Sequence, residues 1–491
     1  MSQTLLCVSL TTPTVEETLS VLHSAGRRFD IAELRLDYLP EPTEDDVRRL
    51  LEGRPCPVIV TNRPEREGGR WTGDEAARLE LLAVADRLGA DYVDVEIDSL
   101  DGYAPQGRAG LIVSYHNYDE TPADLAAIAR RIEQTDAAVV KLATHANSLL
   151  DNLAAIHVLR DATKPTIAVT MGEHGHVSRV LGAKFGAFLV FASLGAGREA
   201  APGQVPVDQM LDLYRFRNVG PGTALYGVVA NPVAHSMSPA IHNAAFGHCG
   251  IDAVYLPFRV DDVAEFIPAY QTLPVAGYSV TIPHKQSVIA LLQDVQPLAA
   301  RIGAVNTIVD RGGRLVGSNT DWSAAVAAVG SGLREGESLD GKRVLLVGAG
   351  GAARAMAFGL AERGCDVVIA NRTRERAVRL AADVGCTQVD VADMGSVPYD
   401  ILVNGTSLGM HPRVDATPAD AAMLREGAVV FDSVYNPLET RLLREAAGAG
   451  CRTVKGLEMF VNQAVEQFEL WTGQTAPRDV MRQVVAARLS G

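Results

Sequence analysis

The chain has 491 residues, of which 47% are hydrophobic and 21% charged, and its formal net charge is −14. At roughly 100 to 200 residues per domain, this length predicts two to four globular domains, each able to bury its own core. The acidic balance, without any basic tract, argues against nucleic acid or an anionic membrane as a partner and leaves small anionic substrates possible.

The six cysteines are scattered and include no C-x-x-C pair. This pattern argues against a zinc site or a disulfide framework and favours a reducing compartment. The N-terminus runs directly into an apolar stretch at 5–10 without a basic leader, and the apolar run around 185–194 is too short to span a bilayer. We therefore expect a cytoplasmic protein.

Before Pro221, short β-rich runs alternate with helix-length segments, which is the spacing of successive βα units in a parallel sheet. Eight such runs occur, at residues 5–10, 31–36, 58–61, 92–97, 111–116, 138–143, 166–170 and 188–192. Eight units of this kind predict a (β/α)8, or TIM, barrel.

The unusual polar residues of this half cluster at the C-terminal ends of the predicted strands, where barrel enzymes place their chemistry. Polar side chains that were only solvent-exposed would not recur at the same end of successive strands. The residues are Glu33 and Arg35 in the second strand, Arg63 after the third, Asp94 and Glu96 in the fourth, His116 at the end of the fifth, Lys141 inside the sixth and Arg179 after the seventh.

Lys141 lies in the apolar run 137–143, where an ammonium is costly unless it is paired or neutralised. A neutral amine there can attack a carbonyl to form a Schiff base, and His116 offers a general base on the adjacent strand. The alternative is a buried lysine paired with Glu96 or Glu33 for structure alone. His174 and His176 lack a third ligand at metal-site spacing, so no metal is expected.

The first half resembles the type I 3-dehydroquinate dehydratases along nearly its whole length, through ELRLD at 33–37, Arg63 with the 67–69 segment, SYHNY at 114–118, VVKLA at 139–143 and APGQ at 201–204. The resemblance implies that Lys141 forms an imine with the C3 ketone of 3-dehydroquinate, while His116 removes a C2 proton and then protonates the departing hydroxyl. It also implies a set of substrate-binding residues, with Glu33, Arg35, Arg63 and Glu67 on the hydroxyl face and Arg179 with Gln204 on the carboxylate. Ala200 stands where family members often have serine.

The stretch 205–222 is predicted to form a last barrel helix followed by a Gly/Pro linker, after which a new strand begins at 226–230. We therefore expect four parts. These are a barrel at 1–218, a substrate lobe at 222–322, a cofactor lobe at 323–456 and a helical segment at 457–491 that packs on the substrate lobe.

Two motifs of the expected substrate lobe carry polar groups. Ser236 and Ser238 suit a carboxylate, although they also suit an ST-turn or N-cap before Pro239. Lys285 follows a proline-stiffened turn and Asp321 ends the run GSNTD, a pair that is either catalytic or an ordinary surface ion pair.

A strand-like run at 344–347 leads into Gly348, Gly350 and Gly351, and a helix of small and apolar residues is expected from Ala352 to Ala361. This is a dinucleotide-binding βαβ pattern, in which Gly348 permits a tight turn and the phosphates bind at the helix N-terminus. The second strand should end in Asn371-Arg372-Thr373 in place of an acid. With Arg372 and Arg376 as planar donors, these residues favour the 2′-phosphate of NADP over NAD.

From about Tyr226 to the end, the chain resembles the shikimate dehydrogenases through these motifs taken together. The resemblance implies that Lys285 relays a proton and that Asp321 orients it. It also implies substrate contacts from Ser236, Ser238, Thr281, Asn306, Tyr435 and Gln463, and a nicotinamide end lined by 404–410. Arg354 either reaches the cofactor phosphates or is a helix-surface arginine, and Ser279 stands where many relatives have asparagine.

The two halves fit together chemically, because dehydration of 3-dehydroquinate gives 3-dehydroshikimate, which reduction with NADPH converts to shikimate. The chain thus resembles the fused dehydratase-dehydrogenases of the shikimate pathway. Three alternatives stay open, namely a dehydrogenase half that uses quinate and NAD, one half that is a catalytically dead binding module, and a generic Schiff-base aldolase. The sequence does not specify the oligomeric state.

Overall fold

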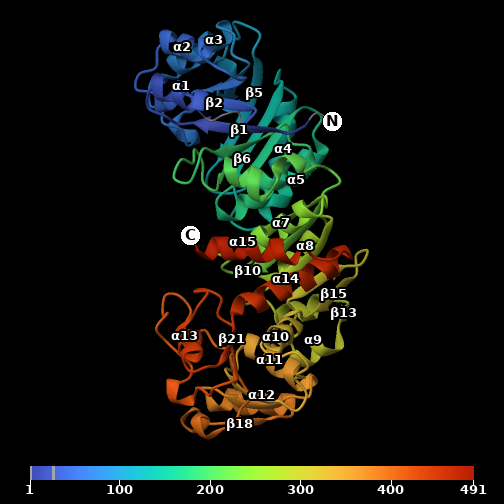
Figure 1. Ribbon diagram of the computed structural model, residues 1–491. Helices are drawn as coiled ribbons and strands as arrows, with labels where there is room; N and C mark the ends of the chain where they lie inside the picture. Colours follow the sequence, from blue (N-terminus) through green and yellow to red (C-terminus); the bar gives the residue numbers. More distant parts are fainter. Residues whose placement is uncertain (1–2, 25–27, 491) are drawn as a thin grey trace. The chain divides into compact units, whose positions relative to one another are not determined.

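The computed structural model describes residues 3–24 and 28–490, which form two compact units (Figure 1). One unit comprises residues up to 224 together with 252–260, and the other comprises 225–251 together with the chain from 261 onward.

The first unit is built on a nine-stranded parallel sheet with the order β7-β6-β5-β4-β3-β2-β1-β8-β9. Its eight main strands confirm the expected α/β barrel pattern, and β7 and β8 meet where the Phe188 amide donates to the Thr166 carbonyl at 2.8 Å. The strands are β1 (Leu5–Leu10), β2 (Ile31–Arg35), β3 (Val58–Thr61), β4 (Tyr92–Glu96), β5 (Gly110–Asn117), β6 (Val139–His145), β7 (Thr166–Met171), β8 (Leu189–Ser193) and β9 (Val205–Pro206). The connecting helices are α1 (Val15–Ser24), α2 (Glu44–Glu52), α3 (Glu75–Arg87), α4 (Leu125–Glu133), α5 (Asp151–Asp161) and α6 (His176–Leu181).

The inside of the barrel is layered, because alternate residues of a strand point to the same side. The deepest layer is an apolar core cluster of Cys7, Ile31, Ile59, Ile112, Val139, Ile167 and Leu189. Two residues further along the same strands, the inward positions are Ser9, Glu33, Thr61, Ser114, Lys141, Val169 and Phe191. The polar residues of the barrel therefore rest on an apolar floor.

The prediction of a single helix within 205–222 is wrong. The structure has the short strand β9, then one π-helical turn at Gln209–Leu213 and a 3-10 turn at Phe216–Asn218. Arg215 lies between the two turns with a φ of 53°, and a residue in this left-handed region ends a right-handed helix.

A six-stranded mixed sheet has the order β11-β10-β12-β14-β15-β13. The strands are β10 (Ala224–Ala230), β11 (Ala253–Arg259), β12 (Val275–Val280), β13 (Asp294–Val295), β14 (Thr307–Asp310) and β15 (Leu315–Ser318), and the helices are α7 (Ser238–His248), α8 (Val263–Tyr270) and α9 (Pro297–Ile302). Helices α14 (Gly456–Thr472) and α15 (Arg478–Ser490) return to this lobe, where α15 contacts α7 and the Trp471 indole donates to the Ile308 carbonyl at 3.0 Å.

The last sheet is parallel throughout, with the order β18-β17-β16-β19-β20-β21, and confirms the expected Rossmann lobe. Its strand order reverses between β16 and β19, the point where open α/β sheets bind ligands. The strands are β16 (Arg343–Val347), β17 (Asp366–Ala370), β18 (Thr387–Val389), β19 (Ile401–Asn404), β20 (Val429–Asp432) and β21 (Arg452–Val454). The helices are α10 (Asp321–Ser331), α11 (Gly351–Glu362), α12 (Arg374–Val384) and α13 (Arg441–Gly448).

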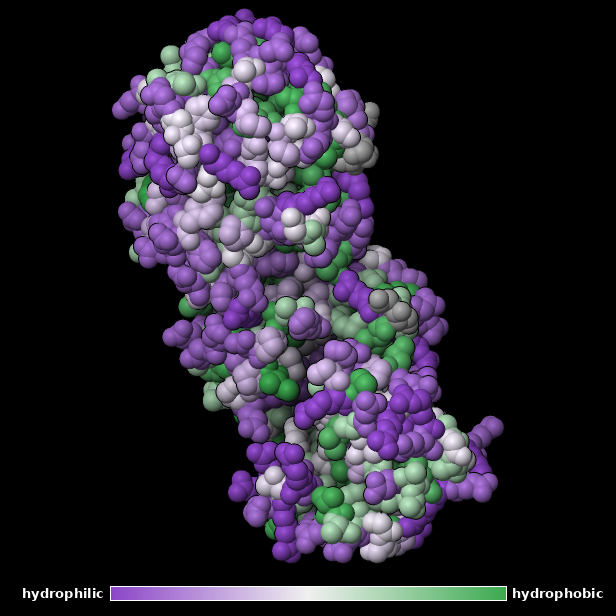
Figure 2. All heavy atoms as spheres, turned by 90° about the vertical axis from the view of Figure 1, so that its left-hand side faces the viewer, coloured by the Kyte–Doolittle hydropathy of each residue, from purple (hydrophilic) through white to green (hydrophobic). Residues whose placement is uncertain are grey.

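On the face shown in Figure 2, hydrophobic residues form small groups between hydrophilic ones. Within the described residues, no helix combines the length and the apolarity needed to cross a membrane.

Candidate active sites

A cavity lies at the carboxyl ends of the barrel strands and collects most of the residues predicted from the first half. Its lining includes Glu33, Arg35, Arg63, His116, Lys141, Arg179 and Gln204, together with Ser9, Tyr118, Met171 and Phe191, which the sequence did not single out. Parallel strands bring their carboxyl ends to one edge, so residues far apart in sequence meet here.

The Lys141 ammonium lies between two carboxylates. Its Nζ is 2.7 Å from Asp94 Oδ2 and 3.3 Å from Glu33 Oε1, and it faces the Phe191 ring at 4.6 Å. Of the two acids considered from the sequence, Glu33 is a partner, whereas Glu96 pairs elsewhere. Burial alone would raise the pKa of Asp94, but the charges of Arg63 and Lys141 outweigh burial and hold this pKa well below its usual range.

Three hydroxyls fix these two carboxylates. Ser9 and Thr61 donate to Glu33 at 2.6 and 3.0 Å, and Ser114 donates to Asp94 at 2.6 Å. None of the three was predicted from the sequence, although each stands at an inward-facing position of its strand. With their oxygens bonded, Glu33 and Asp94 hold the amine at a defined position.

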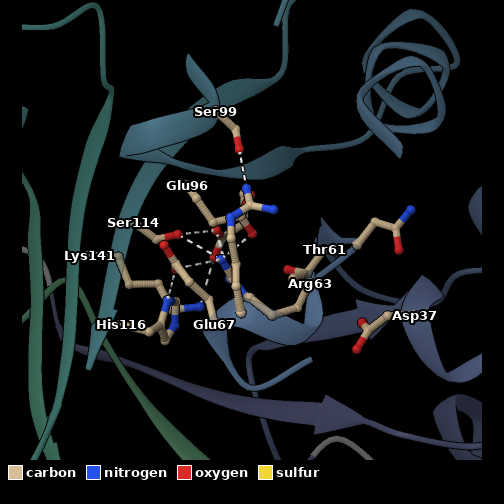
Figure 3. A network of polar contacts seen from close by, with 12 residues as sticks. Asp37, Thr61, Arg63, Glu67, Glu96, Ser99, Ser114, His116 and Lys141 are labelled. Carbon is tan, nitrogen blue, oxygen red and sulfur yellow. Dashed lines mark hydrogen bonds and ion pairs between the residues drawn. The ribbon is translucent and has the colours of Figure 1, made fainter. Parts of the chain in front are cut away.

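His116 is backed by Glu67. The His116 Nδ1 lies 2.9 Å from Glu67 Oε2, so Glu67 contacts the imidazole (Figure 3), and it is not among the residues that line the cavity. Burial, together with the charges of Arg63 and Lys141, keeps the pKa of His116 well below its usual value. Burial also raises the pKa of Glu67 to about 7, although Arg63 opposes this shift. An ionised Glu67 accepts a hydrogen bond from Nδ1–H, which leaves Nε2 of the neutral ring unprotonated and able to act as a base.

Arg179 is a buried cation without a counterion. Arg179 is 1% exposed, its Nη2 donates to the Pro202 carbonyl at 3.3 Å, and no carboxylate of the described chain pairs with it. Burial lowers the pKa of Arg179 to about 10. By contrast, Arg35 makes a two-point contact with Asp37 at 2.8 and 2.7 Å. Arg179 is therefore suited to an anion that enters the cavity.

A second cavity, of about 390 Å³, lies beside β12 and α14. All eight catalytic and substrate-binding residues predicted for the second half line it, which brings together Ser236, Ser238, Thr281, Lys285, Asn306, Asp321, Tyr435 and Gln463. The predicted cofactor residue Ala352 also reaches it.

Lys285 and Asp321 form the ionic centre of this cavity. Lys285 Nζ is 2.5 Å from Asp321 Oδ2, and the Asn306 amide donates to Asp321 Oδ1 at 2.9 Å. The Lys285 and Asp321 side chains are 23% and 12% exposed, so the pair lies in a recess and is not an ordinary surface pair.

Local hydrogen bonds explain two other features of the cavity wall. The Ser238 amide donates to Ser236 Oγ at 3.3 Å, so the turn considered from the sequence is present and both residues still line the cavity. Ser279 donates to Gln467 on α14 at 2.8 Å. The serine at this position therefore ties α14 to the end of β12.

The glycine-rich turn leaves space for a dinucleotide. Gly348 has a φ of 127°, and a Cβ there would lie 2.9 Å from the Gly405 carbonyl oxygen, whereas a Cβ at Gly350 or Gly351 would meet nothing within 4 Å. A cavity in front of the α11 N-terminus is lined by Gly350, Gly351, Arg354, Arg376 and Arg379. Backbone amides and cations at this point fit phosphate groups.

The predicted adenosine-end residues divide into two sets. Arg376 lines this cavity together with Arg379, which the sequence analysis missed, whereas Arg372 is exposed outside the lining residues. The Asn371 amide donates to the Thr373 carbonyl at 2.8 Å and closes the turn after β17. Arg354 is engaged by Asp383 at 2.6 Å and by the Ile302 carbonyl.

In the part of the chain that the structure describes, no group of three or more His, Cys, Asp or Glu side chains is placed to hold a metal ion. His176 packs against Tyr214 with ring centroids 5.1 Å apart.

Four family models match the chain in succession. They are type I 3-dehydroquinase at 6–221, the shikimate dehydrogenase substrate binding domain at 228–308, shikimate / quinate 5-dehydrogenase at 332–432 and the shikimate 5′-dehydrogenase C-terminal domain at 456–486.

Individual relatives cover either the whole chain or its second half. Over 98% of its length the chain is 42% identical to a chloroplastic bifunctional 3-dehydroquinate dehydratase/shikimate dehydrogenase of Arabidopsis thaliana, of which it covers 84%. It is also 42% identical to a shikimate dehydrogenase (NADP+) of Bacillus mycoides, over 54% of the chain and 99% of that relative. A crystal structure of a shikimate dehydrogenase in complex with NADP+ matches 55% of the chain and 98% of its own, with 36% identity and a TM-score of 0.53. The chain therefore belongs to the family of bifunctional 3-dehydroquinate dehydratase/shikimate dehydrogenases.

Proposed function

We propose that the barrel dehydrates 3-dehydroquinate to 3-dehydroshikimate through a Schiff base on Lys141, and that the second half reduces 3-dehydroshikimate to shikimate with NADPH. We assign residues 1–218 to the dehydratase, 222–322 and 457–491 to binding of the second substrate, and 323–456 to NADP. The observation that carries the first assignment is the meeting in one cavity of a buried amine, an imidazole in contact with Glu67, and a buried guanidinium with no carboxylate partner among the described residues.

The dehydratase reaction begins at the amine. In its neutral form, Lys141 Nζ attacks the C3 ketone, and the carbonyl oxygen leaves as water to give an iminium. Asp94 and Glu33, at 2.7 and 3.3 Å from Nζ, stabilise the positive charge on that nitrogen.

The base then acts on the carbon next to the iminium. His116 Nε2 removes a C2 proton, and the C–H electrons move toward the iminium nitrogen. The resulting enamine expels the C1 hydroxyl, which takes the proton from His116 and leaves as water. Glu67 stabilises the transient imidazolium through Nδ1. Hydrolysis of the imine returns Lys141, so the net reaction loses one water.

Arg179 orients the substrate. A carboxylate is the ligand that best compensates a buried guanidinium, because the two groups match in charge and geometry. Gln204 borders the same part of the cavity and is held there by a hydrogen bond from the Ala200 amide to its Oε1 at 2.8 Å. This contact comes from the Ala200 backbone, so it does not depend on the side chain at that position.

The reductase half needs a proton donor and a cofactor cradle. The chemistry that bound NADPH supplies is a hydride for the ketone carbon. Lys285 donates a proton to the oxygen as it becomes an alkoxide, and Asp321 holds the ammonium in position. Gly350 and Gly351 give the pyrophosphate access to the α11 N-terminus, and Arg376 with Arg379 receives the 2′-phosphate.

A coupled assay tests both assignments. Purified protein is given 3-dehydroquinate with NADPH as its nucleotide, and NADPH absorbance is followed for the wild type and for Lys141→Ala. We expect the wild type to consume NADPH, and the variant to do so with 3-dehydroshikimate but not with 3-dehydroquinate. No consumption from either substrate would refute the reductase assignment, and consumption from 3-dehydroquinate by Lys141→Ala would refute the Schiff base.

The six cysteines form no disulfide in the structure, which supports the further proposal of a reducing, cytoplasmic location.

A further inference from the structure

A chain of buried charges connects the outer helix α3 to the reactive amine of the barrel. Arg78, on α3, is 0% exposed, and its Nη2 lies 2.7 Å from Glu96 Oε2. The other oxygen of Glu96 is 2.6 Å from Arg63 Nη1, and Arg63 Nη2 is 2.8 Å from Asp94 Oδ1. Asp94 Oδ2 in turn contacts Lys141, so the charges alternate in sign from Arg78 to Lys141. Figure 3 labels three members of this series, Glu96, Arg63 and Lys141.

Resting on the proposed Schiff-base function, we infer that Arg78 and Glu96 are positioning residues for the dehydratase, which set through Arg63 how strongly Asp94 holds the Lys141 ammonium. Neither residue lines the cavity, and no motif in the sequence pointed to Arg78. The charges of Arg78 and Glu96 matter because an amine that is held too strongly as ammonium cannot attack a ketone.

The geometry of this series of ion pairs makes it sensitive to the loss of a charge. The Arg63 Nη2–Asp94 and Arg78–Glu96 contacts are close ion pairs without hydrogen-bond alignment, so they act mainly through Coulomb attraction. Arg63 Nη1 also donates to Ser114 at 2.8 Å, and Ser114 donates to Asp94. Arg63 is thus shared between Glu96 on one side and Asp94 on the other.

Arg78 is fixed independently of the cavity. Its Nη1 donates to the Asn62 carbonyl at 2.6 Å, and its Nε and Nη2 contact Glu75 at 2.9 and 2.8 Å. Removing the positive charge of Arg78 leaves Glu96 with Arg63 alone, which draws Arg63 away from Asp94. Asp94 then neutralises Lys141 more completely, and the ammonium form is favoured.

Several other charged or titratable groups face Lys141. The charged or titratable groups that interact with it are Asp94 of β4, Glu33 of β2, His116 of β5, Cys7 of β1 and Tyr118 after β5, while Arg63 acts through Asp94. None of these residues is substituted in the variants below, so a difference between variants reports on Arg78 or Glu96 acting through Arg63 and Asp94.

The sign of the effect differs between the two residues. At an effective dielectric constant of about 20, a unit charge on the order of 10 Å from a reacting group moves the pH midpoint of its reaction by about one unit. The rate of imine formation falls at low pH, and this fall is the acid limb of its pH profile. Arg78→Met should therefore move the acid limb to higher pH by about one unit. Glu96→Gln removes a negative charge, frees Arg63 for Asp94 and should move the same limb to lower pH.

The experiment measures the rate at which sodium cyanoborohydride traps 3-dehydroquinate on the full chain, by intact mass, as a function of pH. Arg78→Lys keeps the charge and should stay within a third of a unit of the wild type. Arg66→Met is the matched control, because Arg66 also contacts Glu75 and Ser99 but is half exposed, and solvent screens its charge. Oxidation of shikimate with NADP+ by the same chain should be unchanged in every variant.

Opposite shifts for Arg78→Met and Glu96→Gln support the inference, since structural damage would not move the limb in two directions. Equal midpoints in both variants and the wild type overturn it. If Arg78→Met does not fold, the other two variants decide. A shift to lower pH in Glu96→Gln, with Arg78→Lys close to the wild type, supports the inference, and an unshifted Glu96→Gln overturns it. A wild type that is never trapped refutes the Schiff base itself, which is a separate outcome.

Discussion

Replacing Arg179 with methionine should stabilise the ligand-free barrel while it disables the dehydratase. Burial lowers the pKa of Arg179 from 12.5 to about 10. At about 1.4 kcal/mol per tenfold change in protonation, this corresponds to a burial cost of about 3 kcal/mol. Arg179 is 1% exposed and has no counterion among the described residues, so little attraction offsets that cost. An apolar side chain of similar length removes the cost and keeps the packing.

The pH dependence of this cost follows from the sign of the shift. A cation whose pKa is lowered on folding destabilises the native state while both states are charged. The cost is therefore constant below pH 10 and is relieved only as the pH rises from about 10 toward 12.5. Between pH 6 and 9 the difference between the variant and the wild type should not change.

Hydrogen exchange of peptides from β1–β8 measures the stability of the barrel separately from the second unit. We expect Arg179→Met to slow exchange in these peptides, by about 1 to 3 kcal/mol of opening free energy, and to lower kcat/KM for 3-dehydroquinate about 30-fold to several thousand-fold. The control is Arg35→Met, which leaves the buried Asp37 carboxylate without its ion-pair partner and should speed exchange. Faster exchange in Arg179→Met as well would refute the reasoning, because Arg179 would then support the fold and not the substrate carboxylate.

The remaining predictions concern the base, the proton donor and the cofactor. Since the pKa of Glu67 is raised to about 7, its ionised form is lost as the pH falls through 7, and dehydratase kcat should fall with it. Glu67→Gln should lower kcat about 10- to 100-fold and remove that acid limb, and a variant that keeps the limb would contradict the role of Glu67. Lys285→Met should slow reduction of 3-dehydroshikimate by about 100-fold or more while dehydratase turnover in the same chain is unchanged; loss of both would indicate misfolding. Arg376→Ser should raise KM for NADPH by about tenfold or more and leave KM for NADH unchanged, and an equal rise for both nucleotides would exclude a 2′-phosphate contact.

Much of the barrel site could be predicted because its residues obey a simple periodicity. Glu33 and Arg35 lie two residues apart on β2, and Lys141 lies two residues beyond the inward Val139 on β6. Strand alternation and the common edge of parallel strands then bring such side chains into one cavity. The dinucleotide turn was predictable for a similar reason, since Gly348 has a backbone conformation that suits glycine alone.

The sequence could not decide which acid on β4 meets Lys141. Glu96 and Asp94 have the same phase, and strand register aligns Glu96 with Ser114 and Ser114 with Lys141. Asp94 is nevertheless the partner, because barrel strands tilt and stagger, so residues at one level are not those paired along the ladder.

The sequence by itself therefore determined the fold class, the phase of the inward side chains and the kinds of reactive group, because these depend on local periodicity and residue chemistry. Only the tertiary structure decided the partnerships. It set Glu67 behind His116, left Arg179 without a counterion among the residues that the structure describes, linked Arg78 to Lys141 through three intervening charges, and brought Arg379 rather than Arg372 to the phosphate cavity. Each of these depends on distances of a few ångströms between strands and helices that are far apart in the chain, which tilt, stagger and packing fix and which local sequence does not encode.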